Sequence, residues 1–189
     1  MRLSQPRIAP LQDDMLTPEQ AEALLPLRQD PMGVLNVFRT IAQAPGALHR
    51  FGQWGAYVLR HNALPPRQRE MVILRTGWLC KSGYEWAQHV AIGLKDGLTA
   101  EEVERIKQGA DAGWDPADAA LLRATDELHA DQFIEEATWI ELGRHFTDKQ
   151  RMDLVFAVGN YTQISMFLNT FGVQLDEGLT LDPDLKAFR

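Results

Sequence analysis

The sequence predicts an all-α fold of about eight helices. Three observations point to it: apolar residues recur at helical spacing, capping signals precede several of these segments, and no stretch alternates apolar and polar residues as a strand does. The length of 189 residues suits one domain, or two small similar halves, with an ample core. We expect an N-terminal arm over residues 1–16, a helical domain over 17–175 and a C-terminal tail over 176–189.

The first half of the domain is expected to span about residues 17–110. Thr17, Pro18 and Gln20 form a capping box with proline at the first helical position, which predicts a helix to about Arg28. The segment 30–33 contains proline and glycine and should break that helix. A short amphipathic helix near 35–41 and a further helical segment over 48–59 follow.

The most informative segment runs from residue 67 to residue 97. Residues 70–80 are apolar on all sides, which predicts a helix buried in the core, with Pro66 tolerated in its first turn. A second helix should begin at Ser82 and end near Gly97, and a shorter one is capped by Thr99.

The second half is expected to span about residues 111–175. It follows a loop over 109–116 that is rich in glycine, alanine and aspartate. Helices are predicted over about 116–129 and 135–145, and a long, densely apolar last helix follows the cap at Thr147.

Composition and charge exclude several classes of protein. Apolar content of 45% and charged content of 24% are ordinary for a soluble globular protein. A net charge of −7 argues against nucleic acid and anionic membrane as partners. The N-terminus lacks the apolar core of a signal peptide, and no apolar run approaches the ~20 residues that span a bilayer. The sequence therefore predicts a cytoplasmic protein.

The cysteine and histidine pattern predicts neither a disulfide nor a metal site. Cys80 is the single cysteine, so no intrachain disulfide can form, and at the end of the buried helix it is expected to serve packing. The histidines outside the informative segment are scattered and show no metal-ligand spacing.

Among the ionisable residues of this segment, three stand out by their mostly apolar surroundings: Glu70, Glu85 and His89. Glu85 and His89 are four residues apart and should share one face of a helix. Ionisable groups in apolar surroundings are candidates for a functional site. Structural alternatives stay open for each: Ser82 with Glu85 can form a capping box, Glu70 can pair with Arg67 or Arg75, and His89 can be a hydrogen-bonded core residue.

The spacing of these residues resembles the carboxymuconolactone decarboxylase and AhpD-like superfamily. Its thiol peroxidase branch has a glutamate, and twelve residues later Cys-x-x-Cys-x-x-x-His. On this chain Glu70 matches the glutamate and His89 the histidine, while Ser82 and Glu85 stand where the two cysteines would be. Without that pair the disulfide-based peroxidase chemistry has no nucleophile, and the chain looks nearer to the decarboxylase branch.

The resemblance implies a cofactor-independent acid–base enzyme acting on a small anionic carbonyl compound, a carboxylated lactone or keto acid, by decarboxylation or proton transfer. His89 would shuttle the proton, since histidine titrates near neutral pH, Glu70 would orient it, and Glu85 would hold its charge or contact substrate. Ser82 and the start of its helix would bind an oxyanion. Tyr84, Trp78 and Trp86 would wall the pocket, although such aromatics also serve as plain core. Assembly as a dimer, trimer or hexamer is usual in the superfamily.

Two other functions stay open at this stage. A thiol redox protein would have to depend on Cys80, which has no second cysteine to resolve it. A non-catalytic binding protein on the same fold is the other alternative, because a fold does not fix a function. Polar residues in the last helix can line the same pocket or merely bridge helices: Asn160, Tyr161 and Asn169.

Overall fold

The computed structural model describes residues 2–29 and 33–186, and within these ranges it contains helices and no strand. The all-α prediction is confirmed. The α-helices are α1 (Pro18–Arg28), α2 (Asn36–Ile41), α3 (Pro45–Arg60), α4 (Pro66–Leu79), α5 (Gly83–Lys95), α6 (Ala100–Ile106), α7 (Pro116–Asp131), α8 (Glu136–His145) and α9 (Asp148–Phe171). Two short 3-10 turns, η1 (Asp13–Met15) and η2 (Pro183–Leu185), lie near the ends of the chain. Most of the predicted break at 30–33 lies outside the described residues.

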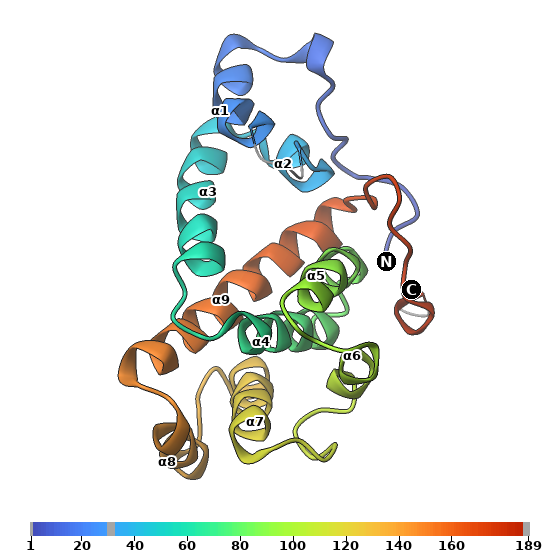
Figure 1. Cartoon of the computed structure of the whole chain (residues 1–189). Coiled ribbons are helices and arrows are strands. Elements are labelled where there is room, and N and C mark those ends of the chain that lie inside the picture. Colours follow the sequence, from blue (N-terminus) through green and yellow to red (C-terminus); the bar gives the residue numbers. More distant parts are fainter. Residues whose placement is uncertain (1, 30–32, 187–189) are drawn as a thin grey trace.

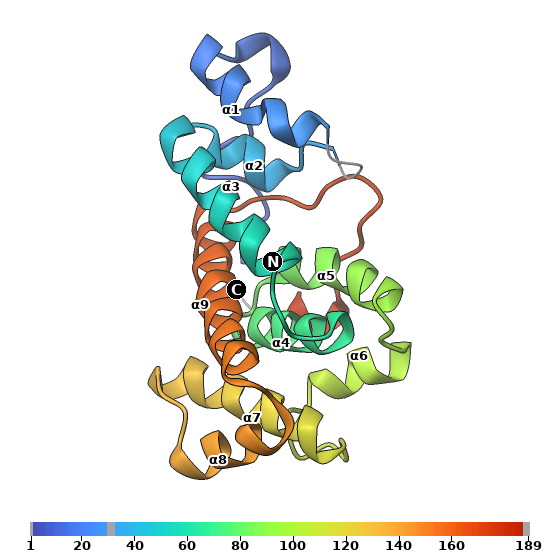
Figure 2. The same ribbon diagram turned by 60° about the vertical axis from the view of Figure 1, so that its left-hand side comes forward.

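Helix α9 is the longest element and crosses the middle of the molecule (Figure 1). Helices α1 to α3 lie toward one end of it, α7 and α8 toward the other, and α4 and α5 against its middle (Figures 1 and 2). It contacts α3, α4, α5, α7 and α8. Helix α4 in turn packs on α5, α6, α7 and α9, which explains why its sequence is apolar on every side.

Three apolar clusters fill the spaces between these helices. One joins α4, α7, α8 and α9 around Ile73, Leu121 and Leu154. A second holds α1 to α3 against the C-terminal end of α9 around Leu24 and Leu168. The third lies between α4, α5, α6 and the C-terminal segment. Helix α4 contributes to two of the three clusters, so its position sets the position of the candidate site.

Capping residues begin several helices where the sequence predicted them. The side chains of Thr17, Thr99 and Thr147 each accept from the backbone N–H three residues on, and the reciprocal half of the capping box is present in all three. Helix α9 ends at Gly172, whose φ of 71° is the left-handed conformation that glycine adopts at little cost. Local chemistry therefore sets these boundaries.

Both ends of the chain pack on the helical body. The backbone N–H groups of Arg7 and Ile8 donate to the carbonyl of Phe171, so the described part of the arm lies on its own chain. On the other side, Asp176 accepts from Tyr84 Oη, from Gln88 Nε2 at 2.8 Å and from the backbone N–H of Asn36 at 2.8 Å. This carboxylate joins the C-terminal segment to α5 and to the start of α2.

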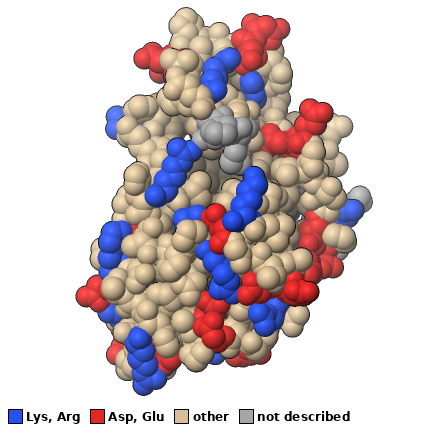
Figure 3. Space-filling model, viewed as in Figure 1, with Lys and Arg blue, Asp and Glu red and all other residues tan. Residues whose placement is uncertain are grey.

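The surface carries both signs of charge. On the face seen in Figure 3, basic and acidic side chains stand among large neutral areas. Among the described residues, no helix has the length and apolarity needed to cross a membrane.

The predicted division into two halves near residue 110 falls in the connection between α6 and α7, and the similarity of the halves stays a prediction.

The central position of α9 gives a stability prediction. Leu154 is fully buried in the cluster that joins α4, α7 and α9, whereas Met152, two residues earlier, is 55% exposed. Leu154→Ala should lower the free energy of unfolding by about 2–5 kcal/mol, because it leaves a cavity. Met152→Ala should change it by less than about 0.5 kcal/mol. Urea unfolding measures both, and equal effects would contradict the packing described.

Candidate active site

Helices α4 and α5 form a tight helical hairpin that carries the candidate residues. Helix α4 ends in a Schellman motif: Lys81 is left-handed at φ 54°, its N–H donates to Trp78, and the N–H of Ser82 donates to Gly77. Ser82 is at the same time the N-cap of α5. Because one residue closes α4 and opens α5, the two helices run back along each other with a fixed register.

Two glycines mark where the two helices pack against each other at the site. A side chain at Gly93 would lie 2.8 Å from Leu98 and 3.5 Å from Glu70, and one at Gly77 would lie 3.5 Å from Glu85. The backbone of α5 therefore lies directly against Glu70, and that of α4 directly against Glu85. An alanine at position 93 would force Leu98 to move.

The hairpin brings Glu70, His89 and Glu85 into one hydrogen-bonded chain. Nδ1 of His89 lies 2.7 Å from Oε2 of Glu70, and Nε2 lies 2.9 Å from Oε1 of Glu85. Glu70 is fully buried, and Glu85 and His89 are 5% and 7% exposed. The spacing in the sequence predicted that Glu85 and His89 share a face; the structure adds that both ring nitrogens of the imidazole meet a carboxylate.

The charges around His89 keep its imidazole protonated. Burial lowers the pKa of His89, but Glu70 and Glu85 outweigh it and raise the pKa from 6.5 to about 10. The ring is therefore an imidazolium at neutral pH, donating one N–H to each carboxylate. The sequence suggested a histidine that titrates near neutral pH, and in this arrangement the two carboxylates prevent that.

Two further residues complete the surroundings of the cluster. Arg69 Nε lies 3.2 Å from the second oxygen of Glu70, and its guanidinium is held by Asp96 at 2.6 Å. The ring of Tyr161 meets the His89 ring edge to face, with centroids 4.9 Å apart. Burial, with the charges of Glu85 and Glu70, raises the pKa of Tyr161 well above its usual value, so its hydroxyl keeps its proton.

The capping-box interpretation of Ser82 and Glu85 is wrong. The Ser82 N–H that Glu85 would have to accept from is already bonded to the Gly77 carbonyl, and Glu85 instead meets the charged ring of His89. The Ser82 side chain makes no cap bond, and its Oγ is fully buried with no hydrogen-bond partner among the described residues. Such a group stands out because most buried hydroxyls are paired.

The structural alternatives for Glu70 are also wrong. Arg75 is bonded to Asp126 and to the carbonyls of Ile106 and Lys107 at the end of α6. Arg67 pairs instead with Asp118 and Glu102. The arginine that does contact Glu70 is its neighbour Arg69, which sequence reasoning missed because the sequence offers three arginines near Glu70 and does not show their partners.

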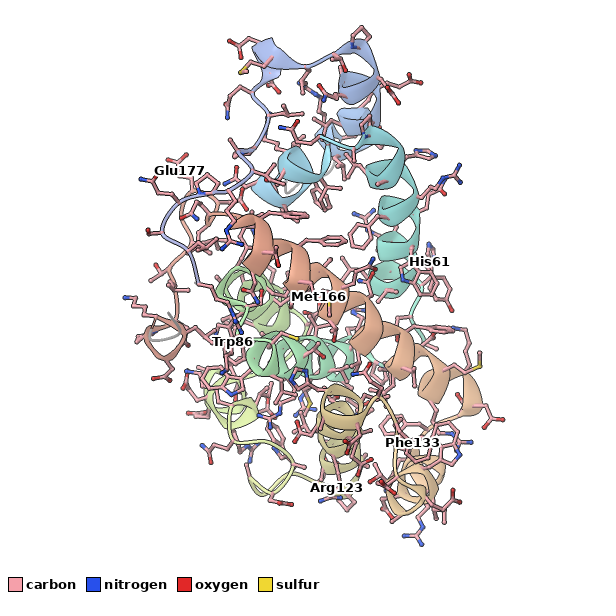
Figure 4. The ribbon with its side chains drawn as sticks, turned by 180° about the vertical axis from the view of Figure 1, so that it is seen from behind. His61, Trp86, Arg123, Phe133, Met166 and Glu177 are labelled. Atoms are coloured by element: carbon pink, nitrogen blue, oxygen red, sulfur yellow. The ribbon has the colours of Figure 1, made fainter. Side chains whose placement is uncertain are left out.

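The aromatic residues expected to wall the pocket have other contacts. Tyr84 donates to Asp176, and burial raises the pKa of its hydroxyl. Trp78 and Trp86 pack on each other with centroids 5.4 Å apart, beside Lys107 of the α6 end. Figure 4 labels Trp86 on α5. Contact of these rings with a substrate stays a prediction.

The polar residues of α9 were expected either to line the pocket or to bridge helices, and the structure shows examples of both positions. Asn169 bridges helices, because its amide donates to the carbonyl of Cys80 at 2.9 Å. Tyr161 faces His89 and belongs to the candidate site. Asn160 is 4% exposed, and its Oδ1 has no hydrogen-bond partner within the described part of the chain.

Cys80 lies outside the cluster, half-buried at the C-cap of α4. Its Sγ is 3.8 Å from Nδ1 of His129, and burial raises the pKa of the thiol. Among residues 2–29 and 33–186, no group of three or more His, Cys, Asp or Glu side chains is arranged to hold a metal ion.

Neither of two surface cavities in the structure is lined by Glu70, Glu85 or His89. One lies between α7 and α8, and the other between α2, α3 and α9. The three residues of the acid–base cluster are all buried.

Comparison with known proteins agrees with this geometry. The model of the carboxymuconolactone decarboxylase family matches residues 45–127, which include the whole α4–α5 hairpin and the acid–base cluster. No curated protein matches the chain. The superfamily resemblance predicted from residues 70–89 is thereby supported, and the single cysteine agrees with a member that lacks the Cys-x-x-Cys pair.

Solved structures similar to the chain share its fold at low identity. A peroxidase-related AhpD-core protein from Ralstonia eutropha has a TM-score of 0.78 at 20% identity, covering 91% of this chain and 93% of that one. The debrominase Bmp8 in complex with 2,3,4-tribromopyrrole has a TM-score of 0.75 at 12% identity, with coverage of 92% and 94%. A peroxidase-related protein from a Silicibacter species has a TM-score of 0.71 at 17% identity, with coverage of 100% and 95%. The AhpD-like fold is thereby confirmed.

The protonation of His89 predicts a pH dependence of stability. The unfolded chain releases this proton near pH 6.5, whereas the folded chain holds it to about pH 10. The contribution of His89 is therefore complete below pH 6.5 and is lost as the pH rises toward 10, by at most about 1.4 kcal/mol per pH unit. The stability of the wild type should fall over this range more steeply than that of His89→Gln. Chemical unfolding from pH 6 to 10 measures both slopes, and parallel slopes would contradict the assignment.

Proposed function

We propose that this chain, as a carboxymuconolactone decarboxylase-like protein of the AhpD-like fold without the cysteine pair, is a cofactor-independent acid–base enzyme. The observation that carries the proposal is the buried chain from Glu70 through His89 to Glu85. Buried ionisable groups that contact one another are costly to the fold, and they cluster where proton transfer is needed. The fold is shared by proteins of different activity, so the function is argued from the site.

The roles follow from the order of the contacts. Glu70 is anchored by Arg69 and fully buried, so it fixes the orientation of the imidazolium. His89 bonds a carboxylate at each ring nitrogen and cannot accept another proton, so it acts as a proton donor or relay. Glu85, which contacts Nε2 of the ring from the first turn of α5, is assigned as the group that meets the substrate.

Decarboxylation of a β-keto acid or a carboxylated lactone fits these roles. The bond between the carboxylate and the α-carbon breaks, carbon dioxide leaves, and the electron pair stays behind as an enolate. A proton that passes from His89 through Glu85 to this carbon completes the reaction, and solvent restores the proton to His89. Simple proton transfer next to a carbonyl would use the same groups without loss of carbon dioxide.

The start of α5 offers the positive pole that an enolate or carboxylate needs. The N–H groups of its first turn point out of the helix end, and the buried hydroxyl of Ser82 beside them has no hydrogen-bond partner among the described residues. A hydroxyl in this position can donate to an oxyanion. This pole is required because Glu85 would otherwise repel an anionic substrate.

The thiol redox alternative rests on one observation, the contact between Cys80 and His129. A thiol beside an imidazole can become a nucleophile. Burial here raises the pKa of Cys80, which disfavours the reactive thiolate, and a second cysteine to resolve an oxidised Cys80 does not exist in the sequence. The acid–base function is therefore the better supported of the two.

Assembly and location complete the proposal. A homo-oligomer is the expected state, since exposed apolar side chains on α3 and α9, such as Trp54 and Met166, would be covered in an assembly. A cytoplasmic location is expected for a protein of this composition and charge.

A thermal-shift screen with carboxylated lactones and aromatic β-keto acids should find ligands that raise the melting temperature, and turnover is then measured on these. With a substrate in hand, His89→Gln should lower kcat by ~10²–10⁴, the usual worth of a general acid–base group. Glu70→Gln should lower it less, because this residue only orients the ring.

Cys80→Ala is the matched control for the redox alternative and should leave kcat unchanged. A substrate whose rate survives His89→Gln would end the mechanism, and loss of activity with Cys80→Ala would favour the thiol instead. If no compound in the screen is turned over although several bind, the chain is a binding protein on the same fold.

A further inference from the structure

An apolar groove lies on the other side of α9, away from the acid–base cluster. It is bounded by α2, α3, α9 and the N-terminal arm, and its volume is about 500 Å³. Cavities that bind small molecules have volumes of about 300–1,000 Å³ and are lined mainly by apolar and aromatic side chains. Figure 4 shows the side chains of α3 and α9 reaching into the space between the two helices.

Three phenyl rings form one wall of the groove. Phe51 of α3 meets Phe167 of α9 edge to face at 5.6 Å, and Phe167 stacks on Phe171 at 5.7 Å with the ring planes 9° apart. All three rings are half-buried, so part of each is open to the groove. Ile41 of α2 continues the apolar surface. A flat aromatic group can add to such a wall by stacking or by an edge-to-face contact.

Two polar side chains at the same groove have no partner in the described part of the chain. Arg50, next to Phe51, is exposed and makes no ion pair or hydrogen bond with any described residue. Gln163, one turn before Phe167, also lines the groove, and its amide makes no hydrogen bond within residues 2–29 and 33–186. By contrast, Arg67, Arg69 and Arg75 are all paired with carboxylates. The free guanidinium gives the groove one positive end.

We propose that this groove is a binding site for a small aromatic carboxylate. The ring lies against Phe51, Phe167 and Phe171, and the carboxylate accepts hydrogen bonds from Arg50, with Gln163 beside it. A guanidinium binds a carboxylate through two parallel N–H groups, which an uncharged ligand of the same shape does not match. The site is independent of the Glu70–His89–Glu85 chain, which belongs to α4 and α5.

Isothermal titration with 2-naphthoate and its uncharged analogue 2-naphthamide tests the proposal. The wild type should bind the carboxylate more tightly than the amide. Arg50→Gln should weaken naphthoate binding about tenfold, the worth of a charge-assisted hydrogen bond, and leave amide binding unchanged. Phe167→Ala should weaken both ligands. Arg144→Gln, an equal change of charge at an exposed position of α8, is the matched control and should change neither.

Four outcomes would overturn the proposal: no binding of naphthoate at millimolar concentration, equal binding of the two ligands, no effect of Arg50→Gln, or loss of naphthoate binding in Glu85→Gln. The last would assign the ligand to the acid–base cluster instead. A second copy of the chain could occupy the groove instead of a small ligand, and light scattering on the same samples tests this alternative. A dimer that Phe167→Ala dissociates, together with absent naphthoate binding, would make the groove a subunit interface.

Discussion

The contact between Glu70 and His89 is the interaction on which the rest of the site depends. A carboxylate with no exposed surface is costly to the fold by several kcal/mol unless its charge is compensated. Here the imidazolium lies 2.7 Å away on one side and Arg69 lies 3.2 Å away on the other. The buried carboxylate of Glu85 in turn needs the imidazolium of His89 to compensate its charge. Neutralising His89 would remove the ion-pair partner of Glu85 and leave Glu70 with Arg69 alone, so the imidazolium holds the four residues together.

The fold supports this unit through a few specific constraints. The Schellman motif at Lys81 and Ser82 sets the register of α4 and α5, and the absence of a side chain at Gly93 leaves room for Leu98 beside Glu70. Helix α9 covers the unit with Tyr161. Helix α4 is surrounded by other helices. For this reason most of its surface is apolar, and its few charged side chains pair with partners inside the molecule.

The sequence predicts the helices and part of the site, but not the pairing of the charges. Caps such as Thr147 and periodic apolar runs are local signals, and the i, i+4 spacing of Glu85 and His89 is local too. The capping box predicted at Ser82 fails because the motif that ends the preceding helix already uses the Ser82 N–H. The partners of Arg67 and Arg75 lie in α6 and α7, so no local rule finds them or shows that Arg69 remains for Glu70. The role of Tyr161 was likewise open, because its contact with His89 joins two distant segments of the chain.

The central claim is that His89 is an imidazolium bridging two carboxylates, and nitrogen NMR of the labelled histidine ring tests it most directly. His89→Gln identifies the signal by its loss. The structure predicts that both ring nitrogens carry hydrogen at pH 7 and that the proton leaves only near pH 10. A neutral ring at pH 7, with a single protonated nitrogen and a transition near the ordinary value of 6.5, would contradict the account.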